Sequence, residues 1–158
     1  MRWDLIDKFE ILKKGSHSRA RKSFSGREDL FKEHFPGRPL IPGSLFIEMV
    51  AQAGGVLFGL ALDFKKEVIL AKISEARFFA EVAPPCELVV EARVEEEREE
   101  GAWISGRVDR DGRTVAEVSL LLVSMEKLNG ARDSVVFNKG FLKHYDVHNI
   151  AKASEAGI

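Results

Sequence analysis

A long apolar stretch in the first half of the chain is its clearest pattern. Across Leu45–Leu62, apolar side chains occupy nearly every position around a helix and not one face alone. A helix that is apolar on all sides is buried on most of them. Pro42 suits a first helical turn because its missing N–H would not be used there, so we expect a buried helix that begins near Pro42 or Gly43. We expect its interior glycines to be tolerated because they approach a sheet closely: Gly54, Gly55 and Gly59.

Beyond this stretch, short apolar and β-branched runs predict strands. The expected strands are Arg19–Phe24, Val68–Ala71, Ile73–Phe79, Leu88–Val94, Trp103–Val108 and Val115–Ser124. Asp111-Gly112 is typical of a tight hairpin between the last two. Residues 5–12 show no clean period and stay unassigned, whereas the Gly- and Pro-rich residues 26–42 predict a loop. One buried helix before a run of antiparallel strands indicates an α+β fold, with the sheet wrapped around the helix.

Composition and charge narrow the class of protein. The 158 residues are 45% apolar and 31% charged, typical of one soluble globular domain, and the net charge of −1 gives no basic field for nucleic acid. The single cysteine, Cys86, allows no internal disulfide, and no Cys/His cluster has zinc spacing. Residues 44–62 could span a membrane by length, but Glu48 and Gln52 favour a core helix. The N-terminus carries acids where a signal peptide needs an apolar run, so we expect a cytoplasmic protein without membrane insertion.

The segment that leads into the helix brings a histidine near a carboxylate. His34 stands in a turn rich in Gly and Pro, and Glu48 lies inside the apolar helix. A charged group is costly to bury, so Glu48 needs a partner or a chemical role. Gln52, one turn further on, is expected to be its hydrogen-bond partner and not a catalyst. A histidine can act as a general base near neutral pH.

This segment closely resembles one family. The run His-Phe-Pro-Gly-Arg-Pro-Leu-Ile-Pro-Gly at residues 34–43, four further residues and then Glu-x-x-Ala-Gln-Ala-Gly-Gly are similar to the β-hydroxyacyl-[acyl-carrier-protein] dehydratases of the FabZ type. The similarity continues in Ala76-Arg77-Phe78 and at Pro85. It implies a hot-dog fold, in which an antiparallel sheet wraps around one long helix, in agreement with the pattern above. We expect this dehydratase domain to cover residues 1–126.

The resemblance also implies a site. The family's catalytic pair is a histidine and an acid fourteen positions later, here His34 and Glu48, which face each other across a dimer. Gly43, nine positions after the histidine, would offer its N–H to the thioester oxygen. Related FabA enzymes carry aspartate at the acid position and also isomerise the double bond, so Glu48 favours dehydration alone. The implied substrate is a 3-hydroxyacyl group of fatty acid biosynthesis, carried on the phosphopantetheine of acyl carrier protein, with no other cofactor and no metal. The implied assembly is a homodimer or a trimer of dimers.

Further side chains are candidates for contacts with the acyl chain or its carrier. Apolar residues beside Glu48 could line a tunnel for the acyl chain: Phe46, Met49 and Val50. A locally basic stretch could meet an acidic carrier protein or be ordinary surface: Lys13, Lys14, Arg19, Arg21 and Lys22. Arg77 is a weaker candidate for the same contact.

The end of the chain and three alternative functions stay open. Residues 127–158 form an extension of unknown role, where apolar residues such as Phe137 and Tyr145 could form a short helix or a surface arm. This tail and the Met49-Val50 pair leave open a dehydratase of a specialised lipid or polyene pathway. A hot-dog acyl thioesterase is a second alternative, although those enzymes usually lack the His-Phe-Pro-Gly motif. An acyl-binding module without catalysis is the third, and it predicts loss of His34 or Glu48.

Overall fold

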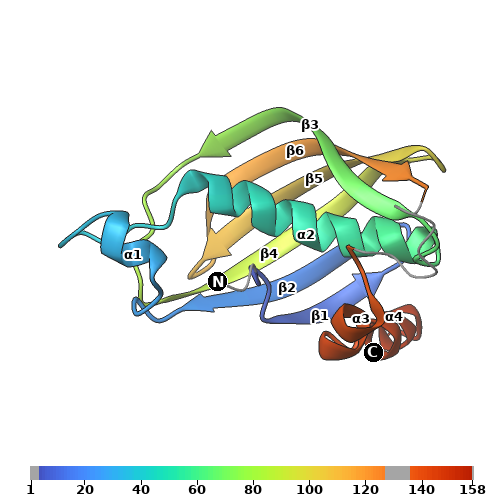
Figure 1. Cartoon of the computed structure of the whole chain (residues 1–158), viewed down its shortest axis with the longest axis horizontal. Helices are drawn as coiled ribbons and strands as arrows, with labels where there is room; N and C mark the ends of the chain where they lie inside the picture. Colours follow the sequence, from blue (N-terminus) through green and yellow to red (C-terminus); the bar gives the residue numbers. More distant parts are fainter. Residues whose placement is uncertain (1–3, 127–135, 158) are drawn as a thin grey trace.

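The computed structural model describes residues 4–126 and 136–157. The elements of these two segments are, in chain order, β1 (Lys8–Lys13), β2 (His17–Phe24), α1 (Leu30–Glu33), α2 (Gly43–Ala61), β3 (Glu67–Phe78), β4 (Cys86–Glu97), β5 (Gly101–Arg110), β6 (Arg113–Met125), α3 (Lys139–His144) and α4 (Val147–Glu155). The long helix α2 runs across the sheet, with α1 beyond its first turn and α3 and α4 beside its last turns (Figure 1).

All strands join one antiparallel sheet in the order β1-β2-β4-β5-β6-β3. The edge strands are therefore β1 and β3. The sheet curves around α2, which lies along its concave face (Figure 1). This arrangement confirms the predicted α+β class and the hot-dog fold.

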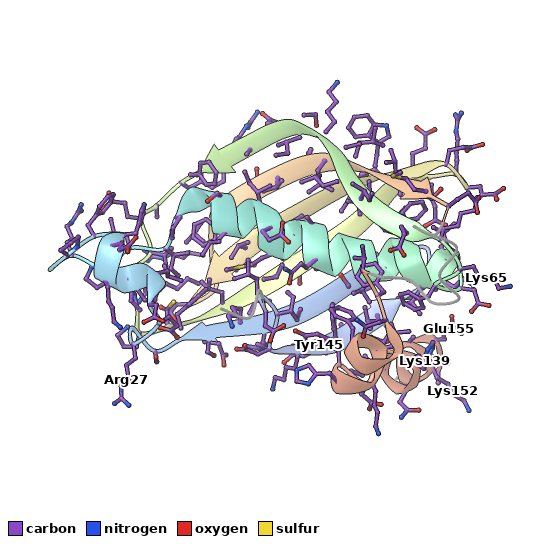
Figure 2. The ribbon with its side chains drawn as sticks, in the orientation of Figure 1. Arg27, Lys65, Lys139, Tyr145, Lys152 and Glu155 are labelled. Atoms are coloured by element: carbon purple, nitrogen blue, oxygen red, sulfur yellow. The ribbon has the colours of Figure 1, made fainter. Side chains whose placement is uncertain are left out.

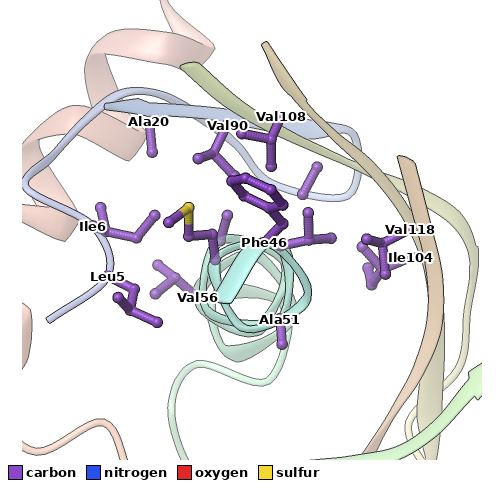
Figure 3. Close-up of a cluster of buried hydrophobic side chains, with 14 of the residues drawn as sticks. Leu5, Ile6, Ala20, Phe46, Ala51, Val56, Val90, Ile104, Val108 and Val118 are labelled. Carbon is purple, nitrogen blue, oxygen red and sulfur yellow. The ribbon is translucent and has the colours of Figure 1, made fainter. Parts of the chain in front are cut away.

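The core fills the space between α2 and the concave face. Phe46 points from α2 towards Val90 on β4 and Val108 on β5, while Ala51 points to the opposite side of the helix (Figure 3). Burial of each large apolar side chain contributes about 1.5–3 kcal/mol to stability. α2 is long and apolar enough to cross a membrane. However, 72% of its most apolar 18-residue stretch is buried inside the protein, as expected for the core helix of a soluble protein.

The glycines of α2 only partly behave as expected. A Cβ at Gly54 would lie 2.8 Å from Cγ2 of Ile104, so this glycine does allow α2 to approach β5 closely. Gly55 and Gly59 do not face the sheet. A Cβ at these positions would meet aromatic rings instead, that of Phe137 for Gly55 and those of Phe64 and Phe137 for Gly59. The prediction of sheet contact is therefore wrong for these two glycines, which sit on another side of the helix.

The strand boundaries differ from the sequence pattern where the pairing is irregular. Val68–Ala71 and Ile73–Phe78 belong to one continuous strand, β3, which ends one residue before the predicted Phe79. Its register against β6 shifts twice. β1 forms mostly within the unassigned residues 5–12 and ends one residue beyond them, at Lys13. Its register against β2 shifts between Phe9 and Ile11. Such shifts interrupt the alternation of apolar and polar positions by which a strand is recognised. The predicted hairpin is present, and Asp111-Gly112 adopts the positive φ values of a tight turn.

The extension folds against the domain and is not a loose arm. The described part of it forms α3 and α4, which lie beside β1 (Figure 1). Tyr145, which follows α3 and is labelled in Figure 2, donates a hydrogen bond to the carbonyl of Ile6 at 2.9 Å. Ser154 accepts one from the backbone N–H of Leu12 at 3.0 Å. Residues 127–135, where part of the extension was predicted, lie outside the described segments.

Candidate active site

His34 follows α1 directly and is half-buried. Its Nδ1 lies 3.0 Å from the carbonyl oxygen of Leu40, and its ring stacks on Phe35 with centroids 4.1 Å apart. A carbonyl oxygen only accepts hydrogen bonds, so in this contact Nδ1 carries the proton. Neutral imidazole then keeps a lone pair on Nε2, the arrangement a general base needs.

The loop that carries His34 is held by backbone hydrogen bonds. Leu40 donates its N–H to the carbonyl of His34 at 3.0 Å, and Ile41 donates to the carbonyl of the buried Val82 at 2.9 Å. An exposed ion pair between Arg38 and Glu81, at 2.6 Å, joins the same two segments. The connection between β3 and β4 thus positions the histidine loop, a contact that sequence spacing did not reveal.

Glu48 lies in the second turn of α2 and is half-buried. The side-chain amide of Gln52 donates a hydrogen bond to its Oε1 at 3.0 Å, so the expected contact between these residues is present. The oxygen of Gln52 accepts the backbone N–H of Leu5 at 3.3 Å. The amide thus has a fixed orientation, with its NH₂ group directed at the carboxylate. Gln52 holds Glu48 in place and links it to the segment before β1.

Gly43 is the first residue of α2, after Pro42 in an extended conformation. The N–H groups of a first helical turn have no partner within the helix, and the helix dipole adds partial positive charge there. A Cβ on Gly43 would lie 3.0 Å from the ring of Phe78 on β3. The N–H of Gly43 therefore lies at the positive end of the helix dipole, in a confined space beside an aromatic ring.

Phe78 was given no role by sequence reasoning. Its ring is half exposed, lies over Gly43 and has its centroid 6.4 Å from that of Phe46. An exposed phenylalanine at the end of an edge strand was the signal that could have drawn attention to it. It forms one wall of the space in front of the first turn of α2.

The other predicted contacts lie away from this space or are already paired. Met49 and Val50 are fully buried and Phe46 is 2% exposed, so all three are core side chains of the single chain. Arg21 of the basic stretch is bound to Glu10 and Glu87 at 2.8 and 2.7 Å. Within residues 4–126 and 136–157, no group of three or more His, Cys, Asp or Glu side chains is placed to hold a metal ion.

Comparison with known proteins places the chain in a family. The FabA-like domain model matches residues 2–119. The 3-hydroxyacyl-[acyl-carrier-protein] dehydratase FabZ of Thiobacillus denitrificans is 37% identical over 128 residues, which cover 78% of this chain and 88% of that protein. That of Pectobacterium atrosepticum is 34% identical over 120 residues, covering 74% and 80%. Among solved structures, the dehydratase heterocomplex ApeI:P from Xenorhabdus doucetiae has a similar fold, with a TM-score of 0.66, 20% identity and coverage of 79% and 85%. The chain therefore belongs to the FabA-like domain family.

Proposed function

We propose that this protein is a hydro-lyase that dehydrates 3-hydroxyacyl-[acyl-carrier-protein] to trans-2-enoyl-[acyl-carrier-protein] in fatty acid biosynthesis. The observation that carries the proposal is the 37% identity to a FabZ dehydratase over 128 residues. The match of the FabA-like domain to residues 2–119, a range that includes His34, Gly43 and Glu48, supports it. The cytoplasm, where carrier-bound acyl chains would be met, is the proposed location.

The reaction removes a proton from C2 and the hydroxyl group from C3 of the substrate. In this proposal, Nε2 of His34 takes the C2 proton, because Nδ1 is occupied by its hydrogen bond to Leu40. Negative charge then develops on the thioester oxygen, where the N–H of Gly43 and the dipole of α2 stabilise it. The C3–O bond breaks and the hydroxide leaves as water with a proton from Glu48. The two electrons of the C2–H bond become the new double bond, so the reaction needs no oxidant.

We infer that a second copy of the chain completes the site. The edge strand β3 exposes Ile73 and Phe78, and Phe79, the residue after it, is exposed as well. Their relative exposures are 44%, 50% and 54%. An edge strand with unpaired backbone groups and apolar side chains is a template for pairing with another strand. Pairing through β3 would bring a second molecule to the strand that carries Phe78, next to Gly43. The proposed homodimer then places His34 of one subunit opposite Glu48 of the other, and three such dimers could assemble further.

The acyl chain would be delivered on the phosphopantetheine arm of acyl carrier protein, and no other cofactor takes part. Phe46, Met49 and Val50 stay candidates for the wall of the acyl path, but they would have to move apart to admit a chain between α2 and the sheet. Exposed basic groups near the site, such as Arg38, could contact the acidic carrier, although Arg38 and Arg77 are each paired with a glutamate.

Thioester hydrolysis and dehydration can be separated in one experiment. Wild-type protein is incubated with 3-hydroxybutyryl-[acyl-carrier-protein], while enoyl absorbance and free carrier thiol are followed together. A dehydratase raises enoyl absorbance and releases no thiol. Release of thiol without enoyl product would instead indicate a thioesterase, and neither signal from folded protein would contradict both activities. A parallel series with medium and long acyl chains would separate bulk fatty acid synthesis from a specialised lipid pathway.

A further inference from the structure

The carboxyl group of Glu48 is connected to the C-terminal extension by a chain of hydrogen bonds. Nε2 of Gln52 donates to Oε1 of Glu48 at 3.0 Å, and Oε1 of Gln52 accepts the backbone N–H of Leu5 at 3.3 Å. One residue further on, the carbonyl of Ile6 accepts a hydrogen bond from the hydroxyl group of Tyr145 at 2.9 Å. These contacts link the candidate acid on α2 to a side chain of the extension.

The segment before β1 is bound both by α2 and by the extension. Leu5 and Ile6 lie beside α2 (Figure 3), and both are buried. Tyr145 is buried as well, and its ring packs edge-on against Phe9 of β1 with centroids 5.8 Å apart. Its hydroxyl oxygen also lies 3.5 Å from Oδ1 of Asp4. The extension therefore contacts the backbone of the same short segment whose N–H group holds the glutamine amide.

The orientation of the Gln52 amide decides which oxygen of Glu48 can donate a proton. A backbone N–H only donates, so the N–H of Leu5 keeps the amide oxygen on its own side and the NH₂ group towards Glu48. Oε1 of Glu48 then acts as an acceptor, and Oε2 is left to carry the proton of the carboxyl group. If the amide turned over, its oxygen would face Glu48 and compete with the substrate for that proton. The position of the Leu5 N–H therefore affects the chemistry and not only the stability.

We propose that Tyr145, through this chain of hydrogen bonds, positions the carboxyl group of Glu48 for proton transfer to the leaving hydroxyl group. The inference rests on the proposed dehydratase function, in which Glu48 is the acid. Tyr145 is a positioning residue, because it acts through Ile6, Leu5 and Gln52 and touches no reacting atom. It lies outside residues 2–119, which the FabA-like domain model matches, so the extension supports the site from beyond the matched domain. Since the acid acts in the chemical step, loss of this support should lower kcat more than it changes KM.

The test measures kcat and KM for 3-hydroxybutyryl-[acyl-carrier-protein] in the full-length protein. Tyr145→Phe removes the hydroxyl group and keeps the ring with its packing. Ser154→Ala is the matched control, because it removes a comparable bond of the extension, that from the N–H of Leu12 at 3.0 Å, which lies outside the chain of bonds to the acid. Both substitutions are also made in Gln52→Ala and in Gln52→Met, so that one folded background is enough. Circular dichroism and thermal unfolding establish that each variant is folded.

We expect Tyr145→Phe to lower kcat by about two- to tenfold, the range that corresponds to one hydrogen bond between neutral groups, with KM near that of wild type. Ser154→Ala should keep the wild-type kcat, although it also loses a hydrogen bond of the extension. In the Gln52 variants, Tyr145→Phe should lower kcat no further, because the link to the acid is already broken.

Three results would overturn the inference while wild-type protein is active. They are an unchanged kcat in folded Tyr145→Phe, an equal loss of kcat in Ser154→Ala, and a full additional loss when Tyr145→Phe is added to a Gln52 variant. The last two would show that the extension only stabilises the fold in general. Folded wild-type protein without dehydratase activity would instead contradict the proposed function, and the inference would fall with it.

Discussion

The two ends of α2 are built from different kinds of contact. At its beginning, Gly43 and Glu48 stand in half-buried surroundings, next to a histidine loop that is held by backbone hydrogen bonds. At its end, the helix is enclosed by aromatic rings, with Phe58 fully buried and Phe64 and Phe137 packed over Gly59. One helix thus joins the end that carries the proposed catalytic groups, here called the reactive end, to a packed end that is enclosed by aromatic side chains. Changes at the first end should alter activity with the fold intact, and changes at the second should alter stability first.

The largest effect is expected at the reactive end. Glu48→Gln keeps the size of the side chain and its contact with Gln52 but removes the carboxyl proton that the leaving hydroxyl needs. We expect kcat to fall by about 10²–10⁴-fold, the usual contribution of a general acid or base, while the unfolding midpoint stays near that of wild type. Steady-state kinetics and thermal unfolding measure both. Equal rates in the variant and wild type would remove Glu48 from the mechanism.

The packed end should respond in the opposite way. Phe58→Ala removes a fully buried ring near the end of α2 and leaves a cavity, so the free energy of unfolding should fall by about 3–5 kcal/mol. Urea titration followed by circular dichroism gives the value. At temperatures where the variant is still folded, its kcat should stay within a few-fold of wild type. A large loss of activity without loss of stability would show that the two ends are not separable.

A smaller effect is expected for the residue between the two ends. Gln52→Ala removes the hydrogen bond to Glu48 and the acceptor for the N–H of Leu5. A hydrogen bond between neutral side chains contributes about 0.5–1.5 kcal/mol, so we expect kcat/KM to fall by up to roughly tenfold. Unchanged kcat/KM together with lower stability would assign Gln52 a structural role alone.

The smallest effect concerns the loop before α1, where Glu28 is bound to backbone. Burial alone would raise the pKa of this carboxyl, but hydrogen bonds from the N–H groups of Ser25 and Gly26 outweigh it and hold the pKa below its usual value. Because the pKa of Glu28 is lower in the folded state, its ionised carboxyl stabilises the protein at pH values above the unfolded-state pKa of about 4.3. This stabilisation is lost as the pH falls from that value through the folded-state pKa.

Glu28→Gln should therefore flatten the loss of stability below about pH 4.3, with only a slight change at neutral pH. Urea midpoints measured between neutral and acidic pH in wild type and variant test this. If the urea midpoints of wild type and variant fall in parallel as the pH drops below about 4.3, these hydrogen bonds do not favour the ionised carboxyl.

The sequence predicted the reactive end of α2 better than the packed end. The His34–Gly43 motif and the apolar run are local patterns, and local patterns set where the helix begins and which residues share a turn, as with Glu48 and Gln52. The contact of Phe137 with Gly55 joins residues 82 positions apart, and no periodicity reports it. β1 and the continuity of β3 were missed for a related reason, because their register shifts break the alternation on which strand recognition depends.

Dehydration by wild type and His34→Ala side by side tests the account most directly. Both proteins are given 3-hydroxybutyryl-[acyl-carrier-protein] in one direction and a crotonyl thioester in the other, and enoyl absorbance is followed. His144→Ala, which alters an exposed histidine of the extension, is the control. The account predicts activity in wild type and in the control, and a loss of at least about 100-fold in folded His34→Ala. Undiminished activity in His34→Ala would contradict it.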